Sequence, residues 1–198
     1  MFIPRYFIFR FSKKYKILDN IKINKNATVI DFGAHIGEVS DYFLRKDCKV
    51  YAYEPSLSSF KNLKKLEKNK NFKCFNLGLS NIKETKYLYN KFANNISFLS
   101  QGSSVFKNKY KNSKNYEKCI FDTLDNILNK FEYVNLIKID IEGSEYLIID
   151  DLLKNIDKFD LCLIETHKKY DFFNEMHLEF LEKINSSKHK HKFNLNWF

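Results

Sequence analysis

Ala27-Thr-Val-Ile-Asp-Phe-Gly-Ala-His-Ile-Gly37 is the stretch that decides the fold of this 198-residue chain. Its first half is apolar and β-branched and stops at Gly33, which is the pattern of a short buried strand. The residues that follow place Val39 and Phe43 at helical spacing. The stretch therefore predicts a strand, a tight turn and a helix in succession.

The same alternation continues along the rest of the chain. Further strands are predicted over residues 48–53, 72–77, 134–140 and 160–165, with a last strand near 192–197. Helices are predicted after the first two strands and over residues 122–128, 144–154 and 175–184. Right-handed crossovers between such strands leave few packings other than a mostly parallel, twisted sheet with helices on both faces. The predicted fold class is therefore α/β.

Residues 82–121 lack the helical pattern. Short strand-like runs at 85–89, 96–99 and 116–121 lie among asparagine, serine and lysine, and Gly78-Leu-Ser-Asn81 ahead of them is typical of a turn. We predict a small β-rich flap over residues 82–121, inserted into one domain that spans residues 27–198. Residues 1–26 form a basic and aromatic N-terminal extension.

The composition indicates an ordinary globular protein with a basic surface. Hydrophobic residues make up 44% of the chain and charged residues 29%, far from the composition of a disordered chain. The formal net charge of +10 comes almost entirely from lysine, since only Arg5, Arg10 and Arg45 are arginines. Because nucleic-acid recognition favours arginine forks, we do not expect a nucleic-acid partner. A basic surface could equally attract phosphorylated or nucleotide-linked substrates or an anionic membrane, so charge alone does not choose the partner.

Cysteine usage and hydropathy favour a cytoplasmic protein. The four cysteines are widely separated, so neither a zinc site nor a disulfide framework is indicated, and buried reduced thiols are expected. No apolar run approaches the roughly 20 residues that span a bilayer. The aromatic N-terminus is compatible with peripheral membrane contact, but Pro4 interrupts a long amphipathic helix, so we favour packing against the domain.

The glycine turn and the next strand end predict a nucleoside site. Gly33 and Gly37 allow a sharp turn after Asp31, and Glu54 follows about twenty residues later, where a carboxylate can accept both ribose hydroxyls. The alternative is a plain tight turn and a surface glutamate. The G-x-G-x-x-G spacing that binds a pyrophosphate is missing, which favours S-adenosylmethionine over NAD.

Several motifs together resemble the FkbM-type methyltransferase family. They are D-F-G-A-H-I-G at 31–37, Y-E-P at 53–55, G-S-S at 102–104, T-L-D at 123–125, K-I-D-I-E-G-S-E at 138–145 and I-E-T-H at 164–167. The resemblance runs from about Ala27 to His167 and implies a Rossmann-like fold, S-adenosylmethionine and O-methylation of a small molecule or glycan. The chain has His35 where the family typically carries asparagine.

Residues just after the strands are the candidates for binding and catalysis, because ligands of such sheets bind at the carboxyl ends of the strands. For cofactor binding we predict Asp31, Gly33, His35, Gly37, Glu54, Gly78, Leu79 and Asp140. For catalysis we predict Asp140, Glu165 and His167, whose carboxylate or imidazole groups can take the proton of an alcohol. Lys138 belongs either to the site or to an ion pair beneath it, and Glu145 either to the site or to the start of the next helix.

Other interpretations remain open at this stage. Carboxylates and His167 could gather around magnesium, but the spacing does not require it, so we expect full activity after exhaustive chelation. An RNA methyltransferase, a non-catalytic nucleoside-binding protein and a nicotinamide oxidoreductase are the competing functions. The short region after His167 allows either an abbreviated sheet or one completed by a partner chain in a homodimer.

Overall fold

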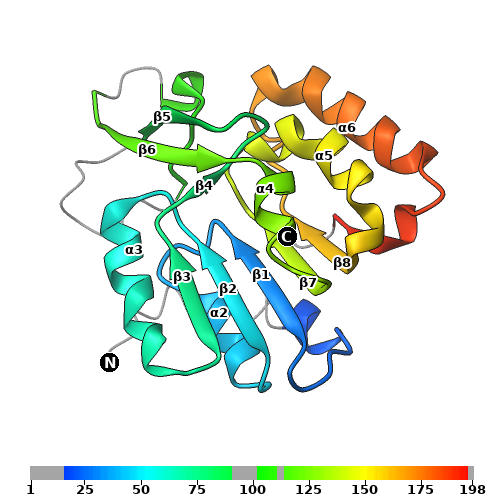
Figure 1. The fold of residues 1–198 in the computed structure, drawn as a ribbon. Coiled ribbons are helices and arrows are strands. Elements are labelled where there is room, and N and C mark those ends of the chain that lie inside the picture. Colours follow the sequence, from blue (N-terminus) through cyan, green and yellow to red (C-terminus); the bar gives the residue numbers. More distant parts are fainter. Residues whose placement is uncertain (1–15, 91–101, 111–113, 196–198) are drawn as a thin grey trace.

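A six-stranded sheet forms the centre of the computed structural model, which describes residues 16–90, 102–110 and 114–195. Its strands are β1 (Thr28–Phe32), β2 (Lys49–Tyr53), β3 (Phe72–Phe75), β7 (Val134–Ile139), β8 (Phe159–Ile164) and β9 (Phe193–Asn194). Their order is β3-β2-β1-β7-β8-β9, and every neighbouring pair is parallel (Figure 1). The predicted Rossmann-like sheet is therefore confirmed.

Helices cover both faces of this sheet. They are α2 (Glu38–Leu44), α3 (Leu57–Leu63), α4 (Leu124–Leu128), α5 (Ile149–Lys154) and α6 (Asn174–Ser186). Alternate residues of each strand enter different cores: Val29 packs with residues of α2 and α3, whereas Ile30 packs with residues of α4, α5 and α6. Because both faces are buried, the strands are apolar on both sides, as parallel sheets require.

A second sheet lies beyond the carboxyl ends of β1 and β2 (Figure 1). It contains β4 (Gly78–Leu79), β5 (Glu84–Tyr89) and β6 (Tyr116–Asp122) in the order β4-β6-β5. The flap strands predicted at 85–89 and 116–121 are thus confirmed, while the run at 96–99 lies outside the described residues. The prediction of a turn at 78–81 was wrong in its first half, because Gly78 and Leu79 pair in parallel with Phe121 and Asp122.

Smaller differences concern the second half of the chain. The predicted helix over 144–154 begins as a 3-10 helix, Ser144–Ile148, before α5, and the last strand is shortened to β9. The four cysteines are buried and reduced. Of the N-terminal extension, residues 1–15 lie outside the described residues, whereas Leu18 is buried in the core beside α2. Among the described helices, none has the length and apolar character to cross a membrane.

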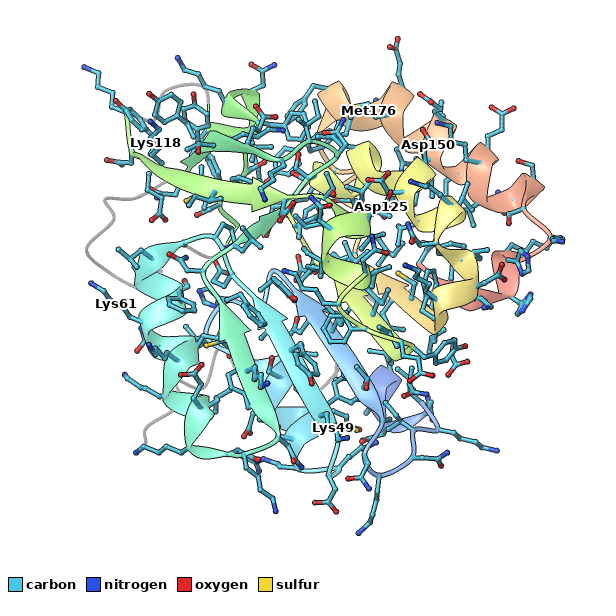
Figure 2. All side chains as sticks on the ribbon, in the orientation of Figure 1. Lys49, Lys61, Lys118, Asp125, Asp150 and Met176 are labelled. Carbon is cyan, nitrogen blue, oxygen red and sulfur yellow. The ribbon has the colours of Figure 1, made fainter. Side chains whose placement is uncertain are left out.

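Exposed lysines lie on several different elements of the described part of the chain. Lys49 at the start of β2, Lys61 on α3 and Lys118 on β6 are all exposed and lie on different elements (Figure 2). A basic stripe along one element would indicate a nucleic-acid track, and these lysines do not form one.

The strand order also locates the natural ligand crevice. The chain runs from β1 outward to β2 and β3 and then returns to place β7 on the other side of β1. Crossovers therefore leave in opposite directions from β1 and β7, and open α/β sheets bind ligands at this point, outside the carboxyl ends of the strands.

Candidate active site

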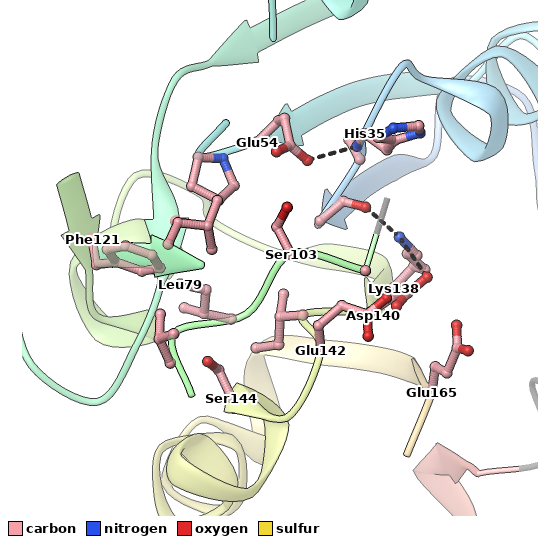
Figure 3. A pocket seen from close by; sticks show the side chains of 18 of the residues that line it. His35, Glu54, Leu79, Ser103, Phe121, Lys138, Asp140, Glu142, Ser144 and Glu165 are labelled. Carbon is pink, nitrogen blue, oxygen red and sulfur yellow. Dashed lines mark hydrogen bonds and ion pairs between the residues drawn. The ribbon is translucent and has the colours of Figure 1, made fainter. Parts of the chain in front are cut away.

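An open crevice lies at this point of the sheet (Figure 3). Its volume is about 920 Å³ when the space open to solvent is included. Its walls come from the ends of β1, β2, β7 and β8, from β4, and from the flap residues 102, 103 and 105. Of the predicted site residues, seven line it: Gly33, His35, Glu54, Gly78, Leu79, Asp140 and Glu165. Asp31, Gly37 and His167 do not belong to its lining.

Only a glycine fits at position 33, because the end of β1 lies against the end of β7 there. It has a φ of 70°, and a Cβ at this position would lie 1.8 Å from the carbonyl oxygen of Asp140. Its N–H donates to the carbonyl of Tyr53 over 3.0 Å, which ties the turn to β2. The glycine was expected to allow close approach of a ligand. The structure shows that it first allows close approach of β1 to the end of β7.

Asp31 and Lys138 form a buried pair beneath the turn. Their side chains lie 3.1 Å apart, and the Lys138 ammonium also donates to the carbonyl of Gly33 over 2.9 Å. Ser40 donates to the second oxygen of Asp31 over 2.7 Å. Although burial disfavours its charge, Asp31 raises the pKa of Lys138 above its ordinary value. Of the two roles expected for Lys138, the ion pair beneath the site matches this geometry. Lys138 also lines the crevice.

Gly37 allows close packing between two helical segments and does not line the crevice. Its φ is 93°, and a Cβ there would lie 2.8 Å from Leu63 and 2.6 Å from Leu66. The glycine lets the start of α2 pack against the segment that begins with α3.

Glu54 presents a buried carboxylate at the end of β2. One of its oxygens accepts the backbone N–H of His35 over 2.8 Å (Figure 3), and the other accepts the backbone N–H of Ser56 over 2.8 Å. Burial raises the pKa of Glu54 to about 7, against the opposing effect of these two hydrogen bonds. A carboxylate has about four acceptor positions, so Glu54 can still accept hydroxyl groups from the crevice. This is the geometry that a ribose diol needs.

An apolar wall faces the same part of the crevice. It consists of Leu79 on β4, Leu88 on β5, Val105 in the flap and Phe121 on β6. Gly78 packs so closely on the Phe121 ring that a Cβ would lie 2.2 Å from it. A flat heteroaromatic ring fits such a wall, whereas a phosphate group does not.

Carboxylates gather where β7 and β8 end. Asp140, Glu142 and Glu165 line the crevice (Figure 3), and the Asp140 carboxylate lies 3.9 Å from the Lys138 ammonium. Glu165 is placed beside β7 by its N–H, which donates to the carbonyl of Ile139 over 2.9 Å. Asp140 and Glu165 are thus brought together, as predicted from their positions after neighbouring strands.

His167 lies one layer behind these carboxylates. It is 4% exposed, and its two ring nitrogens lie 2.9 Å from Glu142 and 2.9 Å from Glu145. Burial disfavours the charged ring, but the two hydrogen-bonded glutamates raise the pKa of His167 to about 10. The ring is therefore a cation at neutral pH, which cannot accept a proton. Glu145 also accepts the Gly143 N–H over 2.8 Å, so it fixes both the ring and the turn after β7.

Asp140, Glu165 and His167 are close enough to suggest a metal site, since one ligand atom from each lies within 4.8 Å of the others. A histidine binds a metal through a neutral ring nitrogen. Both ring nitrogens of His167 already lie 2.9 Å from glutamate oxygens, so binding a metal would require the ring to give up one of these contacts. Independence from metal stays a prediction.

Two charged residues that support the site were not predicted from the sequence. Glu142 carries the contact between His167 and the crevice, and Lys109 of the flap pairs with Glu142. Glu142 lies inside the motif at 138–145, but it was not among the predicted site residues. Lys109 is one of many lysines, and no local pattern marks it.

A family of known proteins matches most of the chain. The family model described as "Methyltransferase FkbM domain" matches residues 31–194, from the end of β1 to the end of β9. Precorrin-6y C5,15-methyltransferase from Geobacter metallireducens GS-15 is a structural neighbour with 11% sequence identity and a TM-score of 0.49, over 85% of this chain and 68% of that one. No curated protein sequence matches the chain.

Proposed function

The chain belongs to the FkbM methyltransferase family, and we propose that it transfers the methyl group of S-adenosylmethionine to a hydroxyl of a sugar, glycan precursor or related small molecule. The observation that carries this proposal is Glu54. Its buried carboxylate stands at the end of β2 beside the Gly33 turn, at the crevice where a nucleoside is expected.

The cofactor end of the crevice suits a nucleoside that bears an amino acid. Glu54 offers acceptors to the ribose hydroxyls, and the wall formed by Leu79 and Phe121 suits the adenine ring. Asp140, on the other side of the Gly33 turn, offers a carboxylate to the ammonium of the methionine part. The turn lacks the third glycine of a pyrophosphate-binding loop, which argues against a dinucleotide.

The catalytic contribution of the chain is mainly positioning. Bound S-adenosylmethionine would supply a methyl group on a positively charged sulfur. An acceptor oxygen held about 3–3.5 Å from that carbon gains most of the available rate enhancement from orientation. Asp140 or Glu165 is placed to accept the hydroxyl proton while the oxygen–carbon bond would form and the carbon–sulfur bond would break to leave a neutral thioether. Both carboxylates line the crevice, whereas both ring nitrogens of His167 already contact glutamates.

Calorimetric titration tests the cofactor. We expect S-adenosylmethionine to bind the wild-type protein and Gly33→Val to abolish binding, because the new side chain would collide with Asp140. Asn129→Val, at the end of α4 away from the crevice lining, is the control and keeps wild-type affinity. NADH binding in place of S-adenosylmethionine binding would instead identify an oxidoreductase.

Product mass tests the reaction. The protein is incubated with methyl-labelled S-adenosylmethionine and a panel of neutral sugars, sugar nucleotides and total RNA. The masses of the labelled products are then measured by mass spectrometry. We expect a mass gain of one methyl group on a hydroxylated small molecule, and a loss of at least tenfold in rate for Asp140→Asn or Glu165→Gln. Label only in RNA would favour an RNA methyltransferase. Cofactor binding without any labelled product would favour a non-catalytic nucleoside-binding protein.

A further inference from the structure

The flap turn, residues 102–110, forms one wall of the crevice and is held by both apolar and polar contacts. Gly102, Ser103 and Val105 line the crevice, and the 3-10 helix Lys107–Tyr110 follows them. The Phe106 ring lies 5.0 Å from the Phe173 ring, and the Ser104 N–H donates to the carbonyl of Tyr89 over 2.9 Å. Further polar contacts of the turn lead to Glu142, after β7.

Lys109 is the most buried charge of the flap turn. Its side chain is 1% exposed, and its ammonium donates to the carbonyl of Gly102 over 2.7 Å and pairs with the carboxylate of Glu142. The ammonium also lies 5.3 Å from the centre of the Tyr170 ring. One lysine therefore joins both ends of the flap turn to the end of β7.

Glu142 holds its carboxylate between two cations. His167 lies 2.9 Å away on the side of β8, and Lys109 contacts it on the flap side. Burial alone would favour the neutral acid, yet His167 and Lys109 keep the pKa of Glu142 below its ordinary value. The Glu142 backbone has a φ of 57°, and its carbonyl accepts the Ser104 hydroxyl over 2.6 Å. A strained backbone at this position persists because contacts on both sides hold it.

The contacts form one chain of alternating charges, Lys109, Glu142, His167 and Glu145, from the flap to the turn after β7. We propose that Lys109 is a positioning residue that fixes the flap turn 102–110 over the carboxylate end of the crevice through Glu142 and His167. The proposal rests on the proposed function, since the wall that it fixes would enclose the methyl acceptor.

Lys109 and the predicted ribose contact have different partners, so replacing Lys109 should affect the flap turn more than cofactor binding. The predicted ribose contact, Glu54, accepts its hydrogen bonds from His35 and Ser56, whereas Lys109 pairs with Glu142. Loss of the ammonium should therefore loosen the flap turn, including Val105 of the apolar wall, while leaving the ribose contact at Glu54 and the Leu79 and Phe121 part of that wall intact. Acceptor binding should weaken more than cofactor binding.

Hydrogen exchange compares Lys109→Met with Lys107→Met, a matched control two positions away on the exposed side of the same 3-10 helix. Both full-length variants are measured without ligand. We expect amides of residues 102–110 to exchange at least tenfold faster in K109M, and at the wild-type rate in K107M. Equal exchange in the two variants would overturn the proposal. Should K109M not fold, Glu142→Gln removes the same ion pair, and unchanged flap exchange in that variant would equally overturn it.

Two further readouts separate positioning from a general structural role. The NMR titration of His167 should move to lower pH in Glu142→Gln, which removes a negative partner, but not in K109M. With an acceptor from the product-mass assay, K109M should raise KM at least tenfold and leave the affinity for S-adenosylhomocysteine within twofold. A fall in kcat alone would contradict the proposal. Absence of S-adenosylhomocysteine binding in the wild type would instead refute the proposed cofactor and leave the exchange comparison valid.

Discussion

His35 shows how backbone geometry limits the residue choice in the first glycine turn. It has a φ of 53°, in the left-handed region, and its N–H donates to Glu54. Asparagine and histidine are among the side chains that enter this region most readily after glycine. The histidine that replaces the asparagine typical of the family is thus compatible with the same turn.

This account predicts a contrast between two substitutions at His35. His35→Asn should keep the free energy of unfolding within about 0.5 kcal/mol of the wild type, because asparagine tolerates the left-handed region. His35→Val should lose about 1–3 kcal/mol, because a branched Cβ is strained there. Urea unfolding of both variants measures the difference. Equal stability of the two would show that the backbone does not select this residue.

Glu54 predicts a pH dependence of cofactor binding. Its pKa is raised to about 7 by burial, so the carboxyl takes up a proton as the pH falls through that value and then accepts ribose hydroxyls poorly. The affinity for S-adenosylhomocysteine should be highest above pH 7 and on the order of tenfold weaker one pH unit below the pKa. Calorimetry across pH 5.5–8.5 measures this.

Glu54→Gln is the matched control, because it keeps the side-chain size and does not titrate. Its affinity should be weak and nearly constant over the same pH range. The same pH dependence in wild type and E54Q would assign the titration to another group.

At the scale of elements, the sequence predicts which residues follow strands but not how deep they lie. Asp140, Glu54 and Glu165 were placed correctly at strand ends, since parallel strands bring their carboxyl ends together. Asp31 also lies near the end of a strand and was predicted to bind the cofactor, yet it is fully buried beneath the turn. Period-two alternation predicts the face of the sheet on which a side chain lies. How far that side chain lies from the crevice depends on the register between strands, which here places Asp31 opposite Lys138.

Long-range contacts set a second limit. His167 was expected at the crevice because it follows β8, but Glu142 and Glu145 hold it behind the wall. Lys109 reaches Glu142 from a flap whose path no local pattern predicts. Such pairs depend on the packing of the two sheets, which no local pattern specifies.

The buried pair that joins β1 to β7 predicts a large and coupled cost. Lys138→Met should lower the free energy of unfolding by about 3–5 kcal/mol, because it leaves the Asp31 carboxylate buried without its cation. The double variant Asp31→Asn, Lys138→Met should be less destabilised than the sum of its single variants, with a coupling of about 1–3 kcal/mol. Urea unfolding of the four proteins measures the coupling.

The exposed pair Lys25 and Asp47 is the control for this cycle. Its side chains are 80% and 60% exposed at a separation of 3.0 Å, so its coupling should stay below about 1 kcal/mol. Similar coupling in both cycles would show that the pair beneath the turn contributes no more than a surface ion pair.

At the scale of the whole molecule, the crevice connects the two sheets. Leu79 of β4 belongs to the same core as Ile30 and Phe32 of β1, so the small sheet shares its apolar packing with the large one. The crevice walls likewise come from both sheets and from the flap. A ligand that fills the crevice contacts every part of this packing and should stabilise the molecule as one unit.

This arrangement predicts a single unfolding transition that shifts with cofactor concentration. S-adenosylhomocysteine at 100 times its Kd should add about 2.7 kcal/mol to the free energy of unfolding. For a domain of this size that corresponds to a rise in Tm of about 5–10 °C by calorimetry. NADH at the same concentration should leave Tm unchanged, because the turn after β1 lacks a pyrophosphate-binding loop. Two separate transitions, of which only one responds to S-adenosylhomocysteine, would mean that the sheets unfold independently and that the ligand contacts only one of them.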